Sequence, residues 1–427
     1  MRKFRLNAQD TEDATHIAVS LNRAAPVLES AALFNSEELD YLGALPLLPT
    51  DLFGHSAPRL RLLTVDGFQH SWPSLAKFST LVHLGISPYA HVAPYLFRSI
   101  RPGPLAMPGS EEEGLQPFLD ALSNMPALEV LALHDALPLL SLASISTPRS
   151  HITLPRLRVF NMTDYIPQCT LVLACIDIPP TTEMRITCRL DVAMGGGSAV
   201  IVPWLKASAP ARFAGRALSV KDWHGGFKVA SLDPADLDRD IDPPPSPSPN
   251  ASTRPYFELG FECELGDSHL PERQAVVDVL PLDAITTLVT RSEYAILSAK
   301  DFFTLFGACR SLRHLVVIDF CGLGLWAALT LEYMDGTQPM FPVLECLTFD
   351  GVDLNDNERP LKKRLIDRDV AAPGTLKVVR FFDCDLKRAS LKKIKFPKVI
   401  WNGSEELPHG EEEGEDDDDD DDDEDGW

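Results

Sequence analysis

One glycine motif in the chain has the spacing of a nucleotide-binding site. An apolar run over 315–320 leads to Gly322-x-Gly324-x-x-Ala327, and a second apolar run ends at Asp350, 28 residues after the first glycine. Such glycines let the backbone approach a pyrophosphate, and the acid binds a ribose. Cys321 separates the first run from the glycines, and the same strand–helix–strand spacing recurs one unit later without them. We therefore expect no cofactor.

Other groupings that could support catalysis or metal binding are incomplete. Gly195-Gly196-Gly197-Ser198 is not a nucleophile elbow, because Val200 occupies the position of the final glycine, and no phosphate-binding Gly-Lys-Ser/Thr follows. The eleven histidines and eight cysteines show no metal-ligand spacing and no C-x-x-C pair. We predict a protein without enzymatic activity or metal. Its cysteines are expected to be buried thiols of a reducing compartment, the cytoplasm or the nucleus.

The strongest pattern is a strand signature, apolar-x-x-apolar-x-apolar, that recurs after helical stretches. Clear copies begin at Leu60, Leu81, Leu128, Leu157, Leu312, Leu344 and Leu376, with a weaker one at Leu28. A period of this size indicates stacked supersecondary units. Between Thr182 and Thr290 the copies are degenerate: strands are expected near Met184, Ala217, Phe257 and Leu288, but their register stays open.

Alternation within each copy separates a core face from a second face. The fourth and sixth positions point inward, and the third, fifth and seventh point to the opposite, concave face. The polar residues at these outward positions are Thr64, Asp66, His83, Ser87, His134, Asn161, Thr163, His314, Thr348, Asp350 and Arg380. Because concave faces of stacked units are common binding surfaces, we expect this strip to bind a protein partner. The alternative is that these are merely solvated positions.

The repeats divide the chain into three parts. Residues 1–26 are expected to form a helix that caps the stack, because Ile17, Ala18 and Leu21 have helical spacing and Pro26 ends it. Residues 27–404 are expected to form the stack, with a loop at 101–114 and a Pro-rich insertion at 240–255. Residues 405–427 are expected to form a disordered acidic tail. No run approaches the ~18 apolar residues of a membrane helix, so we expect no membrane contact.

Several phrases carry a resemblance to a known family. They are Ala25-Pro26-Val27-Leu28-Glu29-Ser30, residues 52–63, Trp72, and Met125-Pro126-Ala127-Leu128-Glu129. With the repeated units, they resemble leucine-rich repeats and, more narrowly, the fungal F-box proteins with irregular leucine-rich repeats. We therefore predict an α/β fold, an irregular, horseshoe-like leucine-rich-repeat solenoid. The resemblance implies that the repeats recognise substrates of a ubiquitin ligase and that an N-terminal F-box docks a Skp1-type adaptor.

The chain departs from that family at two places. Nothing before Ile17 can hold the helical F-box, so we expect either that this member lost it or that the sequence is incomplete there; binding of the Skp1-type adaptor has no support in these residues. The ninth repeat position, Asn or Cys in regular repeats, is Phe68, Tyr89, Ala136, Tyr165, Phe320, Val352 or Cys384. The turns must therefore satisfy their backbone groups in another way.

Charge is concentrated at the C-terminal end. Of 62 acidic residues, 16 lie in 405–427 with no Lys or Arg, which leaves 46 acids against 39 bases elsewhere. The preceding stretch, 362–398, has 12 bases and four acids. Three hypotheses follow: the tail covers this basic stretch, captures a basic partner such as a histone, or only solubilises the protein. Histone binding is thus the alternative function. The net charge of −23 opposes nucleic-acid binding.

Overall fold

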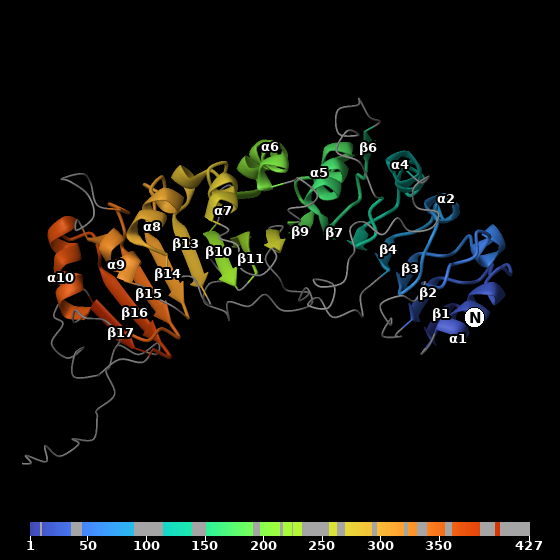
Figure 1. Cartoon of the computed structure of the whole chain (residues 1–427), viewed down its shortest axis with the longest axis horizontal. Helices are drawn as coiled ribbons and strands as arrows, with labels where there is room; N and C mark the ends of the chain where they lie inside the picture. Colours follow the sequence, from blue (N-terminus) through green and yellow to red (C-terminus); the bar gives the residue numbers. More distant parts are fainter. Residues whose placement is uncertain are drawn as a thin grey trace, which may run out of the picture.

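The computed structural model describes residues 1–8, 11–35, 45–88, 114–138, 151–190, 197–213, 217–223, 225–232, 256–262, 270–292, 297–319, 323–330, 340–354, 361–384 and 398–401. Within these ranges the chain forms one arched, open sheet with helices on its outer side (Figure 1). Residues 101–113 of the loop expected at 101–114, the Pro-rich insertion at 240–255 and the acidic tail at 405–427 lie outside the described residues.

Fifteen of the described strands join in a single sheet, and two more form a small parallel pair, β6 (Ile152–Thr153) and β8 (Ile176–Asp177). In spatial order the large sheet contains β1 (Lys3–Ala8), β2 (Ser30–Asn35), β3 (Leu62–Asp66), β4 (His83–Ser87), β5 (Val130–His134), β7 (Val159–Tyr165), β9 (Glu183–Arg189), β12 (Phe257–Glu262), β11 (Gly226–Leu232), β10 (Ala217–Trp223), β13 (Thr287–Ser292), β14 (His314–Ile318), β15 (Cys346–Asp350), β16 (Val378–Phe382) and β17 (Lys398–Trp401).

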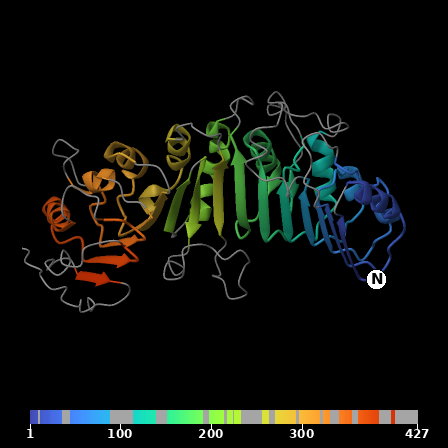
Figure 2. The same ribbon diagram turned by 60° about the horizontal axis from the view of Figure 1, so that its bottom comes forward.

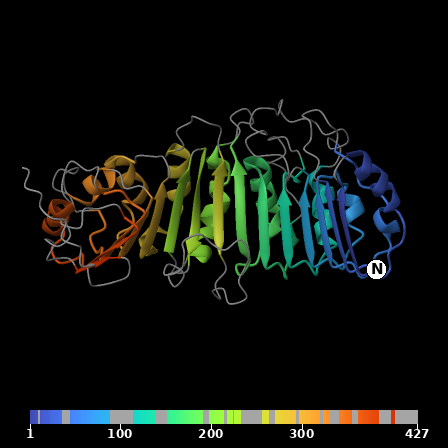
Figure 3. The same ribbon diagram turned by 90° about the horizontal axis from the view of Figure 1, so that it is seen from below.

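Helices in the described ranges cover one side of this sheet. They are α1 (Thr11–Ser20), α2 (Trp72–Leu75), α4 (Leu115–Ser123), α5 (Ile166–Cys175), α6 (Val202–Phe213), α7 (Leu270–Val277), α8 (Ala299–Phe306), α9 (Leu323–Leu329) and α10 (Leu361–Ala371). Figures 2 and 3 turn the opposite, concave side of the sheet toward the viewer, and no described helix crosses it. We call this side the uncovered face.

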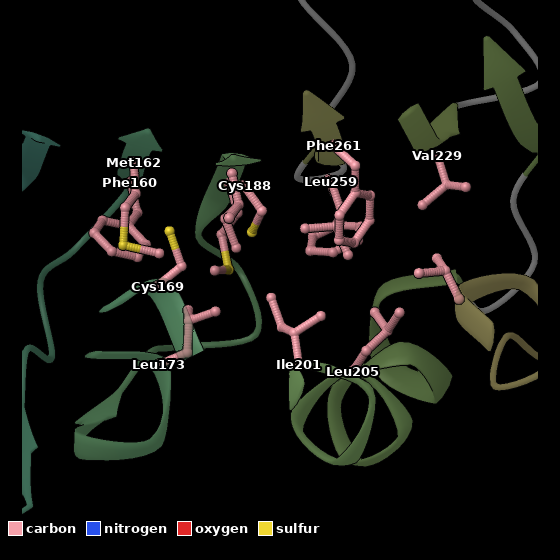
Figure 4. Packing of buried hydrophobic residues seen from close by; sticks show 14 of the residues in the cluster. Phe160, Met162, Cys169, Leu173, Cys188, Ile201, Leu205, Val229, Leu259 and Phe261 are labelled. Carbon is pink, nitrogen blue, oxygen red and sulfur yellow. The ribbon is translucent and has the colours of Figure 1, made fainter. Parts of the chain in front are cut away.

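The predicted alternation explains which side is covered. Side chains at the fourth and sixth repeat positions point toward the helices and are buried, as at Leu63 and Val65 of β3. Strand pairing keeps these positions in register, so Leu63 pairs with Leu84 and Leu84 with Leu131. In the centre, Phe160 and Met162 of β7 and Leu259 and Phe261 of β12 face Cys169 and Leu173 of α5 and Ile201 and Leu205 beside and within α6 (Figure 4). Apolar burial on one side therefore fixes the register of the sheet.

The prediction of a leucine-rich-repeat solenoid is wrong, although the α/β class is right. The structure is a large, mostly parallel sheet that does not close and whose centre leaves chain order: β9 is followed in space by β12, β11, β10 and β13. Strand β11 runs antiparallel to both of its neighbours. A stack of successive repeats would place each strand beside the next one in the chain. The hairpin of β10 and β11 breaks that order, because β12 returns to pair with β9.

The N-terminal end also differs from the expected lone capping helix. Strand β1 comes first and pairs in parallel with β2, with Lys3 opposite Ser30. Only then does α1 begin, and Pro26 lies beyond its end at Ser20. Alternation in β1, with Leu6 and Ala8 buried, was the sequence signal for this strand. At the other half of the chain Ser298 caps α8: its Oγ accepts a hydrogen bond from the Asp301 N–H at 3.2 Å.

The turns after the strands satisfy their backbone groups without the Asn or Cys that regular repeats carry at the ninth position. The residue after β3, β5, β14, β15 and β16 is Gly67, Asp135, Asp319, Gly351 or Asp383, and each has a positive φ. Glycine and aspartate tolerate this left-handed conformation better than most residues. The N–H of Gly67 donates to the Ser87 carbonyl at 2.9 Å, and that of Asp319 to the Asp350 carbonyl at 2.9 Å. At the next position Phe68 and Val352 are then free to fill the core.

Candidate protein-binding face

The uncovered face is unusual for a sheet of this kind. Parallel sheets normally have both faces buried by helices. Here the side opposite the helices presents rows of side chains from the third, fifth and seventh repeat positions, and strand register lines them up across the strands. The sequence correctly placed every one of its candidate residues on this side, but their role in binding remains a prediction.

The structure divides the eleven polar residues of the strip into two groups. The N-terminal group lies on β3, β4, β5 and β7: Thr64, Asp66, His83, Ser87, His134, Asn161 and Thr163. The C-terminal group lies on β14, β15 and β16: His314, Thr348, Asp350 and Arg380. Five strands, β9, β12, β11, β10 and β13, lie between the two groups. The distance from β7 to β14 is therefore about 29 Å at ~4.8 Å per strand spacing. The two groups do not form one compact site.

Small residues at the fifth repeat position form a row across the N-terminal group, and we call this row the trough. Thr64, Gly85 and Ala132 occupy the fifth position of neighbouring strands in register. At Gly85 an added Cβ would lie 3.6 Å from His83 Nε2 and from Thr64 Cγ2, which are ordinary van der Waals contacts. On one side stand Leu62 and His83 of the third-position row, and on the other the seventh-position row from Asp66 to Thr163. The row therefore runs across the strands rather than along one of them.

The two histidines beside the trough, His83 and His134, are neutral hydrogen-bonding groups rather than charged ones. Desolvation by the surrounding strands lowers the pKa of His83 below its ordinary value. Desolvation is also the main cause that lowers the pKa of His134. The Asp135 charge opposes this shift, and the Arg189 charge adds to it. Both imidazoles are therefore neutral near pH 7 and each offers one donor and one acceptor. Asn161 adds a carboxamide oxygen that accepts no hydrogen bond within the described part of the chain.

An ionic cluster lies at the ends of β5, β9 and β12. Arg189 of β9 contacts the carboxylate of Asp135, which follows β5, and its Nε lies 3.5 Å from Glu262 Oε2 on β12. Beneath them Asp164 of β7 is buried on the helix side and accepts hydrogen bonds from the N–H groups of Tyr165 and Leu137 at 2.8 and 3.1 Å. Burial, with the charge of Asp135, raises the pKa of Asp164 to about 7 despite these hydrogen bonds.

Charged side chains in the centre of the face were missed by the sequence. Lys228 Nζ lies 3.0 Å from Glu258 Oε2, and the Tyr256 hydroxyl donates to the same oxygen at 2.5 Å. Arg185 lies over the Tyr256 ring, 5.3 Å from its centroid. These contacts join β9, β12 and β11. The signal that could have located them is the Trp223–Gly226 hairpin, flanked by alternating runs with Lys221 and Lys228 outward.

The C-terminal group lies beside an exposed ladder of opposite charges. Arg313 Nη1 lies 3.0 Å from Glu345 Oε1, and Lys377 Nζ lies 3.2 Å from the other Glu345 oxygen. The hydrogen bond from Lys377 lowers the pKa of the Glu345 carboxyl. Within the same group Thr348 and Arg380 are register partners on β15 and β16, whereas His314 is exposed at the start of β14.

The basic stretch at 362–398 is not a continuous surface patch. Arg368 is 1% exposed and donates to the carbonyls of Leu329, Met340 and Phe341 at 3.1, 2.8 and 2.6 Å. Arg364 is also buried, with its guanidinium 5.6 Å from the Trp326 ring centroid. Both arginines therefore stabilise the packing of α10. Residues 385–397 lie outside the described part, and Lys362 and Lys363 are exposed on α10.

The glycine motif also has a packing role. At Gly324 a Cβ would come within 1.9 Å of the Leu297 carbonyl oxygen, so α9 can approach the start of α8 only with glycine there. Among the described residues, no three His, Cys, Asp or Glu side chains form a group able to hold a metal ion. In the same ranges, no helix is long and apolar enough to cross a membrane. No family model and no curated protein matches this chain.

Proposed function

We propose that this chain is a non-catalytic protein-binding protein whose uncovered face receives an extended segment of a partner polypeptide. One observation supports this proposal above the others: no helix within the described ranges covers the concave face of this mostly parallel sheet. Leaving that face to water exposes surface that related architectures bury. A partner lying across the strands would cover it.

The trough is the part of the face that fits such a segment best. Its members Thr64, Gly85 and Ala132 have small side chains or none, which favours close approach of a partner main chain. Its sides offer the neutral imidazoles of His83 and His134 and the hydroxyl of Thr163. These groups accept or donate hydrogen bonds at neutral pH. Recognition by hydrogen bonds along a groove is typical of extended peptides.

The expected role of the partner follows from the resemblance stated above. Fungal F-box proteins use their repeats to select substrates of a ubiquitin ligase, and we extend that role to the trough as part of the proposal. A cytoplasmic or nuclear location goes with it. The six described cysteines, Cys169, Cys175, Cys188, Cys309, Cys346 and Cys384, are free thiols, as expected in a reducing compartment.

Quantitative affinity capture from cell extract tests the proposal with matched variants. Ala132→Arg fills the trough, whereas Gln116→Arg adds the same side chain to the exposed surface of α4. We expect a set of proteins that binds wild type and Gln116→Arg but is lost with Ala132→Arg. Ubiquitin-ligase adaptor and cullin-type subunits among them would support the F-box resemblance. Equal capture by both variants would contradict binding at the trough.

The acidic tail supports a second candidate function. Residues 405–427 contain 16 acids and no Lys or Arg, a composition suited to binding histones or other basic proteins. Deleting 405–427 should then abolish binding of basic proteins and leave a trough partner bound. If histones bind equally without the tail, this second function is wrong.

A further inference from the structure

Helix α10, the last helix of the described chain (Figure 1), exposes apolar side chains and buries charged ones. The guanidinium groups of Arg364 and Arg368 are buried, whereas Ile366 and Val370 are 50% and 74% exposed. A single exposed apolar residue needs no explanation, but these two are four residues apart and therefore lie together on one side of the helix. Lys362 lies on the same side, one turn earlier. We call Lys362, Lys363, Ile366 and Val370 the α10 stripe.

The first turn of α10 has an excess of positive charge. Lys362 and Lys363 are exposed in this turn, which contains no acidic residue. No carboxylate in the described part of the chain forms an ion pair with either amine, and this includes Asp367, one turn beyond Lys363. The N-terminus of a helix adds a partial positive charge that favours acids there and disfavours lysines. An acidic group bound at this turn is therefore attracted by both lysines and by the helix itself.

The chain contains a segment whose acids and apolar residues come in the matching order. Residues 405–408 have the sequence Glu-Glu-Leu-Pro and begin the acidic segment. On α10 the two lysines come first, and Ile366 and Val370 follow one and two turns later. Acids beside lysines, and apolar groups beside apolar groups, therefore fit both halves of the α10 stripe when the segment runs in the same direction as the helix.

Topology places the start of this segment near the first turn of α10. Strands β15 and β16 are parallel, so α10, which connects them, runs in the opposite direction and begins at the edge of the sheet where the strands end. Strand β17 is parallel to β16 and ends at that same edge, at Trp401. Four residue steps lead from Trp401 to Glu405, about 14 Å when extended. A helix is about 10–12 Å thick, so the first acid reaches the outer side of α10.

We propose that residues 405–408 bind the α10 stripe of the same molecule, with the two acids beside the lysines and the leucine over the apolar pair. Binding there removes exposed apolar surface from water and balances the charge of the first turn. The contact holds only the start of the acidic segment, so most of its 16 acids stay available to a basic partner. The inference involves no residue of the trough and stands apart from the proposed function.

Carbodiimide coupling of the full-length protein tests this contact. The reagent joins lysine amines to carboxylates in direct contact, and mass spectrometry of peptide fragments locates each bond. We expect residues 405–406 joined to Lys362 or Lys363 several-fold more often than any acid of 405–427 is joined to Lys300. That lysine is the matched control, because it is exposed in the first turn of α8, which already carries Asp301. The yield should not change on dilution, because the contact lies within one molecule.

Surface variants test the two halves of the α10 stripe separately. Val370→Ser should lower the coupling several-fold, whereas Val19→Ser on α1, where the valine is 65% exposed, should leave it unchanged. Lys362→Glu with Lys363→Glu removes the amines and should abolish the bond. Adding Glu405→Lys and Glu406→Lys to that variant should restore a bond between the exchanged positions. All variants should keep the circular dichroism spectrum of wild type.

Several results would overturn the inference. They are coupling to α10 that is no stronger than coupling to Lys300, a bond that disappears on dilution, a bond that Val370→Ser leaves unchanged, and no restored bond in the exchange variant. Coupling of Lys228 to Glu258, whose Nζ and Oε2 are 3.0 Å apart, shows that the reagent works. With that bond present, absence of any bond between α10 and 405–406 would also overturn the inference.

Discussion

Arg273 of α7 and Asp222 of β10 form a buried ion pair, with Nη2 and Oδ2 2.9 Å apart and side chains only 5% and 8% exposed. The Arg273 guanidinium also lies 5.8 Å from the ring centroid of Phe227 on β11. One side chain thus ties a helix to both strands of the hairpin that breaks chain order. The pair therefore secures the part of the sheet in which spatial order departs from chain order.

Breaking this pair should destabilise the protein strongly. Arg273→Met leaves the Asp222 carboxylate buried without its cation, which typically costs about 3–5 kcal/mol. Urea denaturation measures the change in the free energy of unfolding. Arg313→Met is the control, because its pair with Glu345 is exposed at the surface and should cost about 0–1 kcal/mol. Equal losses of unfolding free energy in the two variants would show that the buried pair stabilises the protein no more than the exposed one.

Core substitutions test the strand register. Leu131 and Leu315 are 0% and 1% exposed and point toward the helices, so Leu131→Asp and Leu315→Asp should each cost more than the ~2–5 kcal/mol of a Leu→Ala change. Leu62 is 42% exposed on the uncovered face, and Leu62→Asp should have a much smaller effect. Thermal melting followed by circular dichroism distinguishes them. An unchanged melting temperature for Leu131→Asp would show that the register is wrong.

Gly324→Ala tests whether the glycine motif serves packing. The new Cβ would lie 1.9 Å from the Leu297 carbonyl oxygen, so α9 must shift, at a cost of about 1–3 kcal/mol. Gly85→Ala is the control because its Cβ makes only ordinary contacts. Calorimetry should find a lower melting temperature for Gly324→Ala alone. If it finds none, and nicotinamide nucleotides stabilise the wild type, the packing role is wrong.

How far the sequence predicted the structure is clear from particular residues. Alternation around Leu63, Leu131 and Leu315 correctly located strands and their outward positions, because one-sided burial leaves a period of two. It failed at β10, β11 and β12. Each of these strands has the right local pattern, but nothing local states that β12 pairs with β9 rather than with its successor in the chain. That choice depends on long-range contacts such as Arg273 with Asp222.

The sequence predicted which face the candidate residues lie on, because alternation shows the face, but it did not predict which strands are neighbours in the centre. Residues of the trough fall on consecutive strands, so the repeat positions of His83 and Thr163 were enough to place them on one face. Lys221, Lys228 and Arg291 are register neighbours on three strands whose spatial order differs from chain order. Their register could not be obtained before the hairpin was known.

Stability should depend on pH through Asp164. Its folded pKa of about 7 exceeds the ordinary value of 3.8, so the folded protein keeps a proton that the unfolded chain loses. Its contribution is therefore largest below about pH 4 and is lost as the pH rises to about 7, by a few kcal/mol in order of magnitude. Asp164→Asn should flatten this slope in urea denaturation across pH 4–8, whereas the exposed Asp120→Asn should not. An unchanged slope in Asp164→Asn would contradict the assignment.

Binding at the trough is tested most directly by titrating a purified capture partner against three forms of the chain. Isothermal calorimetry should give the same Kd for wild type and Gln116→Arg, and a Kd at least about tenfold weaker for Ala132→Arg, equivalent to ~1.4 kcal/mol. All three proteins should show the same circular dichroism spectrum and melting temperature. Equal Kd values for the three forms, or the same loss in Gln116→Arg, would contradict the account.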